Sequence, residues 1–175
     1  CRQPSVSARR EGIEECVDLL KSMMKDVGID ANVFEVEEGH PVVLGVQKFA
    51  GAGKTLGFYN HYDVQPPEPY EEWISPPFEA EIRDGKIYAR GVADNKGNLV
   101  ARLKATEAVM KMASDIPINL KFFVEGEEEI GSRHLGSFVK ENMDILKADG
   151  YLWEGGGVDE KDRPTISLGV KGIMY

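Results

Sequence analysis

The 175-residue sequence has few cysteines and no long apolar run. Its two cysteines, Cys1 and Cys16, have no paired spacing, which argues against a disulfide framework and against a thiolate metal site. No apolar run reaches the roughly 18 residues of a transmembrane helix, and no basic-then-apolar signal peptide opens the chain. These absences predict a soluble, cytosolic protein with no membrane partner.

Positive charge is scarce as well. The sequence has 21 Lys and Arg against 30 Asp and Glu, which gives a formal net charge of -9 and a pI near 4.9. The basic residues are scattered, so we expect no nucleic-acid partner, which would need them clustered. The 42% hydrophobic content is typical of one globular domain with a sizeable core. Because the first residue is Cys1 rather than Met, we expect a piece of a longer chain.

Helical and strand-like patterns alternate along the sequence. Apolar residues recur every three or four positions in the predicted helices, which cover residues 11–27, 96–113 and 133–146. Strands are predicted over residues 31–38, 41–48, 55–64, 118–124, 150–153 and 165–175, and a hairpin over 78–91. The alternation predicts an α/β fold, a three-layer α/β/α sandwich whose mixed, mostly parallel sheet has helices on both faces.

Four glutamates fall within five positions directly after a strand-like run. The stretch "NLKFFVEGEEEIGS" contains Glu125, Glu127, Glu128 and Glu129, whose charges repel one another. A solvated turn or an acidic helix N-terminus would explain this cluster without any ligand. The alternative is a bound cation.

Acidic or histidine side chains also follow two other predicted strands. His61 and Asp63 come after "TLGFYN", and Glu154 comes after "GYLW". Asp94 lies in "ARGVADNKGN", between glycines that let the backbone approach closely. Sites in such sheets form at the carboxyl ends of the strands, so this recurrence favours one shared site over separate solvated turns.

One histidine with several carboxylates and no cysteine is a ligand set suited to Zn²⁺, Mn²⁺ or Co²⁺. Two divalent ions would balance the four carboxylates of Asp94, Glu128, Glu129 and Glu154, so the sequence favours a two-metal site. Asp63 lies two residues from His61 on the same side of an extended segment. It is therefore placed to hold the imidazole of His61 in the tautomer that binds metal.

Three motifs resemble one known family. "HYDVQP", "ARGVADNKG" and "EGEEEIGS" follow one another about 33 residues apart, and together with "PPFEAEIRDGKIYARG" and "SLGVKG" they are similar to zinc metallopeptidase family twenty. That family includes carboxypeptidase G, aminoacylase, succinyl-diaminopimelate desuccinylase, acetylornithine deacetylase and carnosinase-like dipeptidases. The resemblance covers nearly the whole chain. It implies a zinc-peptidase-like fold and hydrolysis of amide bonds in small peptides or N-acyl amino acids.

The resemblance also implies a role for each motif residue. It makes His61 a terminal ligand of one metal, Asp94 the bridging ligand and Glu129 a ligand of the other metal. Glu128 matches the general base, and Asp63 matches the residue that orients His61. Glu154 falls where the family has an acidic ligand, although Asp149 and Asp159 are nearby alternatives. The family further implies a cis peptide bond after Asp94.

Family members continue beyond the equivalent of Tyr175, into a lid and dimerisation domain and a returning catalytic segment that carries a second histidine ligand. Neither His40 nor His134 matches that histidine. We therefore interpret residues 1–175 as the N-terminal part of a catalytic domain, from a longer protein that forms a homodimer through its lid. We expect the 175 residues alone to bind metal weakly and to have little or no activity.

Two other functions compete with hydrolysis. "GAGKT" resembles the end of a phosphate-binding loop, but Lys48 stands where that motif needs Gly, and no helix is predicted to follow. A non-catalytic metal-binding scaffold of the same fold is the second alternative, and retention of Glu128 and Asp63 argues against it. The sequence does not distinguish dipeptides from N-acyl amino acids as substrate, nor Zn²⁺ from Mn²⁺ or Co²⁺.

Overall fold

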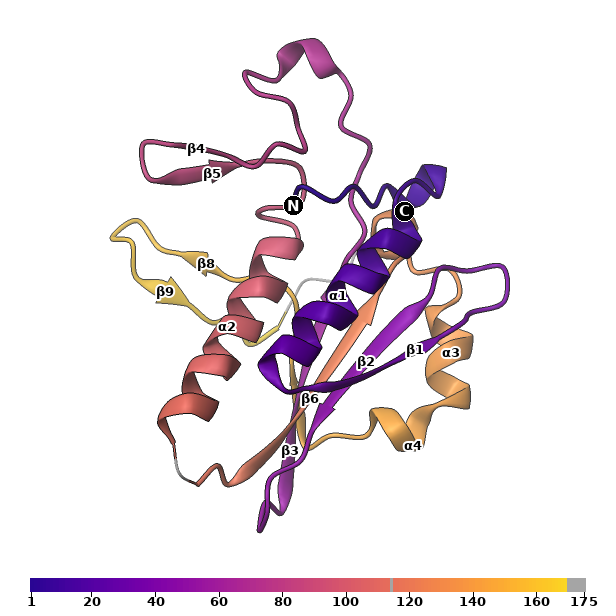
Figure 1. The fold of residues 1–175 in the computed structure, drawn as a ribbon, viewed down its shortest axis with the longest axis vertical. Helices are drawn as coiled ribbons and strands as arrows, with labels where there is room; N and C mark the ends of the chain where they lie inside the picture. The colour runs from indigo at the N-terminus through magenta and orange to yellow at the C-terminus, as the bar shows by residue number, and fades with distance from the viewer. Residues whose placement is uncertain (114, 170–175) are drawn as a thin grey trace.

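A five-stranded sheet forms the centre of the protein in a computed structural model that describes residues 1–113 and 115–169 (Figure 1). The strand order is β1-β2-β6-β3-β7. The strands span Asp30–Phe34 (β1), Val42–Gln47 (β2), Lys54–His61 (β3), Ile118–Glu125 (β6) and Gly150–Leu152 (β7). Among them, β1–β2 and β2–β6 are antiparallel pairs, whereas β6–β3 and β3–β7 are parallel. The mixed sheet is confirmed, but two of the pairs in this five-stranded sheet are parallel and two antiparallel, so it is not mostly parallel as predicted.

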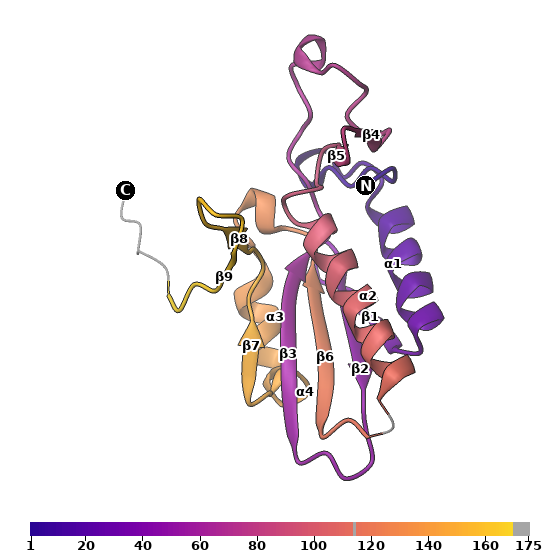
Figure 2. The same ribbon diagram turned by 90° about the vertical axis from the view of Figure 1, so that its left-hand side faces the viewer.

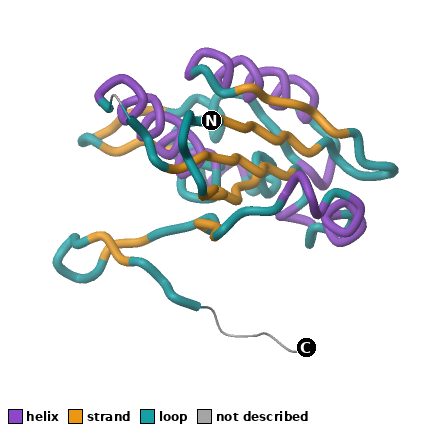
Figure 3. The backbone as a smooth tube through the Cα atoms, turned by 90° about the horizontal axis from the view of Figure 1, so that it is seen from below, coloured by secondary structure: helices purple, strands orange, loops and turns teal. Residues whose placement is uncertain are grey.

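Helices cover both faces of this sheet (Figures 2 and 3). Helices α1 (Ile13–Val27) and α2 (Lys96–Met112) pack on one face, and α3 (Leu135–Glu141) and α4 (Met143–Leu146) pack on the other. Alternation along β6 serves both layers, because Phe122 and Val124 point to the α1 side while Phe123 meets Phe138 of α3. The predicted three-layer α/β/α sandwich is therefore confirmed.

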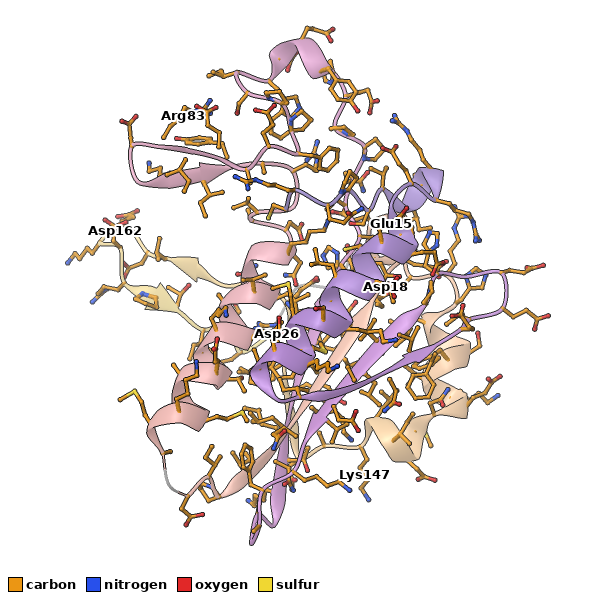
Figure 4. The ribbon with its side chains drawn as sticks, viewed as in Figure 1. Glu15, Asp18, Asp26, Arg83, Lys147 and Asp162 are labelled. Carbon is orange, nitrogen blue, oxygen red and sulfur yellow. The ribbon has the colours of Figure 1, made fainter. Side chains whose placement is uncertain are left out.

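Helix α1 follows the predicted amphipathic pattern. Its apolar residues at three- and four-residue intervals are buried against the sheet, whereas Glu15, Asp18 and Asp26 lie on the outward face (Figure 4). The helix ends at Gly28, whose φ of 88° is the left-handed conformation that favours glycine. No helix of the described residues is long and apolar enough to cross a membrane.

Several predicted boundaries differ from the structure. The predicted helix 133–146 is divided at Asn142, whose side-chain amide donates to Phe138 O at 2.9 Å and ends α3. The predicted strand 31–38 stops at Phe34, and the predicted strand 55–64 stops at His61. Of the predicted strand 165–175, residues 170–175 lie outside the described residues, and of residues 165–169 only Thr165, the last residue of β9 (Pro164–Thr165), is in a strand.

Smaller elements complete the chain. The predicted hairpin is present as β4 (Glu81–Arg83) and β5 (Lys86–Tyr88), joined at Asp84-Gly85. Strand β8 (Gly157–Val158), which was not predicted, pairs with β9. Short 3₁₀ helices cover Ser7–Arg9 (η1), Tyr70–Glu72 (η2) and Glu128–Ile130 (η3).

The three neighbouring parallel strands bring distant segments together. His61 at the end of β3 pairs in register with Glu125 at the end of β6, and β7 ends beside β3 on its other side. Whatever follows these strands therefore emerges at one edge of the sheet.

Candidate metal centre

The side chain of His61 is fully buried at the carboxyl end of β3, and carboxylates from three other segments surround it. Its Nε2 atom lies 2.9 Å from Asp94 Oδ1, 3.1 Å from Glu154 Oε2 and 3.8 Å from Glu128 Oε2. Asp94 precedes α2, Glu128 belongs to η3 after β6, and Glu154 follows β7. The sheet topology thus brings together residues that are far apart in the sequence, such as His61 and Glu154.

Two overlapping sets of ligand atoms meet at this histidine. One set contains His61, Asp94 and Glu129, the other contains His61, Glu128 and Glu154, and the atoms of each set lie within 4.8 Å of one another. All four residues predicted as metal ligands are therefore adjacent. Glu128, predicted as the general base, lies beside them.

Asp63 contacts both the histidine and the glutamate segment. One of its carboxylate oxygens lies 3.3 Å from His61 Nδ1, while its backbone carbonyl oxygen lies 3.1 Å from the same nitrogen. Its two carboxylate oxygens also accept from the backbone N–H groups of Glu128 and Glu129, at 3.2 and 3.1 Å. With a proton on Nδ1, the lone pair of His61 Nε2 would be available to a cation held among the carboxylates.

The electrostatics of the cluster favour a cation. Burial lowers the pKa of His61, but the carboxylates of Asp63 and Glu154 outweigh burial and raise that pKa to about 11. Burial and the neighbouring carboxylates of Glu154, Glu129 and Asp94 raise the pKa of Glu128 to about 7. Burial likewise raises the pKa of Glu129. These shifts show that the negative charges are crowded.

One buried oxygen gives a more direct sign of fit. Within the described residues, Glu154 Oε2 is buried, and its one charged neighbour is His61, whose Nε2 lies 3.1 Å away. Such an atom is costly to leave unpaired, and a divalent cation held by imidazole nitrogen and carboxylate oxygens would satisfy it. The donor set therefore fits Zn²⁺, Mn²⁺ or Co²⁺.

Half of the glutamate cluster has other partners. Glu125 is buried and accepts from Tyr59 Oη at 2.5 Å and Ser132 Oγ at 2.8 Å. Glu127 is also buried, and its carboxylate faces the ring Nδ1 of His134 at 2.9 Å. Only Glu128 and Glu129 of these four glutamates belong to the described ligand sets.

The alternatives to Glu154 have partners elsewhere. Asp149 accepts from the backbone N–H of Thr55 at 2.7 Å, and Asp159 pairs with Arg163 at 2.6 Å. The resemblance also implied a cis peptide bond at Asp94–Asn95, and the structure has one there.

Neither remaining histidine joins the described ligand sets. His40 is buried, and its Nε2 lies 3.0 Å from Ser7 O. "GAGKT" leads into β3 rather than into a helix, which removes the context that a phosphate-binding loop requires.

Two polar contacts of the site were not predicted. Gln65 donates to Glu129 through its Nε2 atom, at 2.8 Å to the backbone oxygen and 2.9 Å to Oε2. Arg102 of α2 contacts the ends of β3 and β7. No local sequence pattern distinguishes Arg102 from the other basic residues of α2, because its partners lie between 42 and 51 positions away.

Comparison with known proteins identifies the family. Residues 57–170 match the model of "Peptidase family M20/M25/M40". The chain belongs to this family. Family membership confirms the resemblance drawn from the three motifs, and residues 57–170 include every predicted site residue.

Individual relatives agree with this assignment. The crystal structure of an M20 family metallo-carboxypeptidase from Sulfolobus solfataricus matches with a TM-score of 0.90 and 46% identity, over 98% of this chain and 39% of that chain. A cysteinylglycine-S-conjugate dipeptidase from Corynebacterium striatum is 30% identical over 91% of this chain and 35% of its own length. A human Beta-Ala-His dipeptidase is 33% identical over 77% of this chain and 27% of its own length. The chain thus spans about a third of the curated relatives it matches.

Proposed function

We propose that this chain carries most of the metal centre of a hydrolase that cleaves amide bonds in dipeptides or N-acyl amino acids. The observation that carries the proposal is the convergence of carboxylates from separate segments on one buried imidazole nitrogen. Membership of the peptidase family supports the reaction type. The printed names of two relatives, which describe dipeptidases, support small peptides as substrates.

In this proposal two divalent cations, most simply Zn²⁺, are held by the predicted residues. His61, Asp94, Glu129 and Glu154 would hold these ions, since each of the four belongs to one of the two ligand sets that meet at His61. A second histidine from a longer chain completes the ligands of one ion. When bound, such ions lower the pKa of water and polarise the scissile carbonyl.

The chain's own residues then position groups and move a proton. Asp63 holds His61 and the backbone of Glu128 and Glu129 in place. The carboxylate of Glu128 accepts a proton from the attacking water and delivers it to the leaving amine. Its side chain lies 3.8 Å from His61 Nε2, beside the proposed ions rather than remote from them.

Further expectations concern the longer protein as a whole. We expect it to form a homodimer through a lid domain and to work in the cytosol. We further expect the 175 residues alone to bind metal weakly and to turn over little substrate. Enzyme-like hydrolysis of dipeptides by these residues with added Zn²⁺ or Mn²⁺ would contradict that expectation.

Glu128→Gln in the longer protein tests the proposed role most directly. Gln is nearly isosteric but cannot accept the proton, so kcat for a panel of dipeptides and N-acetyl amino acids should fall by about 10²–10⁴-fold. Metal content should stay at the wild-type level. Glu160→Gln, an exposed residue outside the described ligand sets, is the matched control. Equal kcat in E128Q and wild type would remove Glu128 as the base, and metal binding without any turnover in the wild type would favour the scaffold alternative.

A further inference from the structure

Arg102 cross-links three segments of the fold. It lies on α2, and its planar guanidinium reaches the sheet edge. The Nη1 atom donates to Tyr59 O at 2.8 Å and to Asn60 Oδ1 at 2.7 Å, and Nη2 donates to Trp153 O at 2.6 Å. One side chain therefore joins the end of β3 to the segment that follows β7.

Two of these partners are next to a proposed metal ligand. Asn60 precedes His61, and Trp153 precedes Glu154. Asn60 is fully buried, and its side-chain amide also donates to the Oδ1 atom of Asn95, the residue after Asp94. Arg102 thus contacts Asn60 and Trp153 directly and is linked to Asn95 through the side chain of Asn60. These three residues adjoin three proposed ligands that come from three segments.

We propose that Arg102 is a positioning residue that sets the spacing of His61, Asp94 and Glu154. The inference rests on the proposed metal centre. It goes beyond that proposal because Arg102 belongs to none of the described ligand sets and lies on another element.

Strand pairing alone leaves this spacing poorly fixed. The β3–β7 ladder is three residues long and ends at the pair Phe58 and Leu152, two residues short of Glu154. Beyond that pair, the ring of Trp153 stacks on Tyr59 with centroids 3.9 Å apart, and Arg102 holds the Trp153 carbonyl. Only a forked donor can bind the β3 and β7 segments at once with two different nitrogens, so Lys is not an equivalent replacement.

The positive charge of Arg102 and its hydrogen bonds predict opposite effects on metal affinity. A positive charge near the site repels a cation, so removing it should tighten metal binding if charge were the main effect. Loss of the cross-link should instead loosen the ligands and weaken binding. Arg102→Lys keeps the charge and loses the fork, whereas Arg102→Met loses both.

Zn²⁺ affinity, measured by competition with a chromophoric chelator, separates these two effects. We expect both R102K and R102M to bind at least about 10-fold more weakly than wild type, the scale of loss when groups that orient metal ligands are removed. Lys104→Met removes an exposed charge from the same helix and should leave the affinity unchanged. Wild-type affinity in R102K, tighter binding in R102M, or an equal loss in K104M would overturn the proposal.

Amide hydrogen exchange of the metal-free proteins gives a second readout that needs no ion. Exchange in residues 150–154 should be faster in R102K and R102M than in wild type and K104M, because the carbonyl of Trp153 loses its donor. Unchanged exchange in both Arg102 variants would overturn the proposal. If wild type bound no Zn²⁺, the proposed metal centre would fail, while the exchange result would still decide whether Arg102 fixes these segments.

Discussion

Asp63 shows how one side chain can organise several others. Its carboxylate lies against His61 Nδ1 and accepts from the backbone of Glu128 and Glu129, although it belongs to neither described ligand set. The sequence predicted its contact with His61 from their spacing of two residues. It did not predict the contacts to residues 128 and 129, because they join positions 65 and 66 apart in the sequence.

Asp63→Asn should weaken Zn²⁺ binding by about 10–100-fold, as removal of groups that orient metal-bound histidines commonly does. The Asn amide would place a donor NH₂ against a backbone N–H, so we also expect a loss of about 1–3 kcal/mol in the free energy of unfolding. Asp18→Asn, on the exposed face of α1, is the control. Calorimetric titration and urea unfolding measure the two effects, and a D63N protein that matched D18N in both would refute this role.

At the scale of elements, the segment from the end of β6 through η3 carries two kinds of glutamate. Glu125 and Glu127 are buried and paired within the protein, whereas Glu128 and Glu129 face the candidate metal centre. A run of acidic letters does not distinguish these roles, because the distinction depends on which distant side chains lie opposite. Tyr59, for example, reaches Glu125 from 66 positions away.

Tyr59→Phe isolates one of these long-range contacts. The ring would keep its stacking on Trp153 at 3.9 Å, but Glu125 would lose the hydroxyl that donates to it. Because hydrogen bonds to charged groups contribute about 1.5–3 kcal/mol, we expect the free energy of unfolding to fall by that amount. Tyr70→Phe, at a half-exposed tyrosine, should change it little. Equal urea midpoints for Y59F and Y70F would show that the Tyr59 hydroxyl does not stabilise the fold.

The helices and strands that were predicted correctly follow from local periodicity in the sequence. Alternation in β6 and the helical repeat of α1 depend on residues close together in the sequence, so the sandwich was predicted correctly. The division of α3 from α4 at Asn142 depends on a side-chain contact with Phe138, and it was missed. The pairing of β8 with β9 was also missed, because strand pairing joins residues that are not neighbours in the sequence.

At the scale of the whole molecule, the chain brings one histidine and several carboxylates to one edge of its sheet. It spans 39% of the length of the Sulfolobus solfataricus structure, so a complete enzyme of this family has further segments to contribute. The family was predictable from three motifs, and the fold was predictable from those motifs and the local periodicity. The substrate was not, because no motif of this chain distinguishes a dipeptide from an N-acyl amino acid.

The central claim is that the carboxylates around His61 bind divalent cations. A calorimetric Zn²⁺ titration of the longer protein, wild type against Asp94→Ala, tests it most directly. Asp94 is 2.9 Å from His61 Nε2 and its side chain is 70% exposed, so its removal should spare the fold and weaken binding by at least about 10-fold. Wild-type binding that is lost in D94A would support the account. Identical isotherms for the two folded proteins would contradict it.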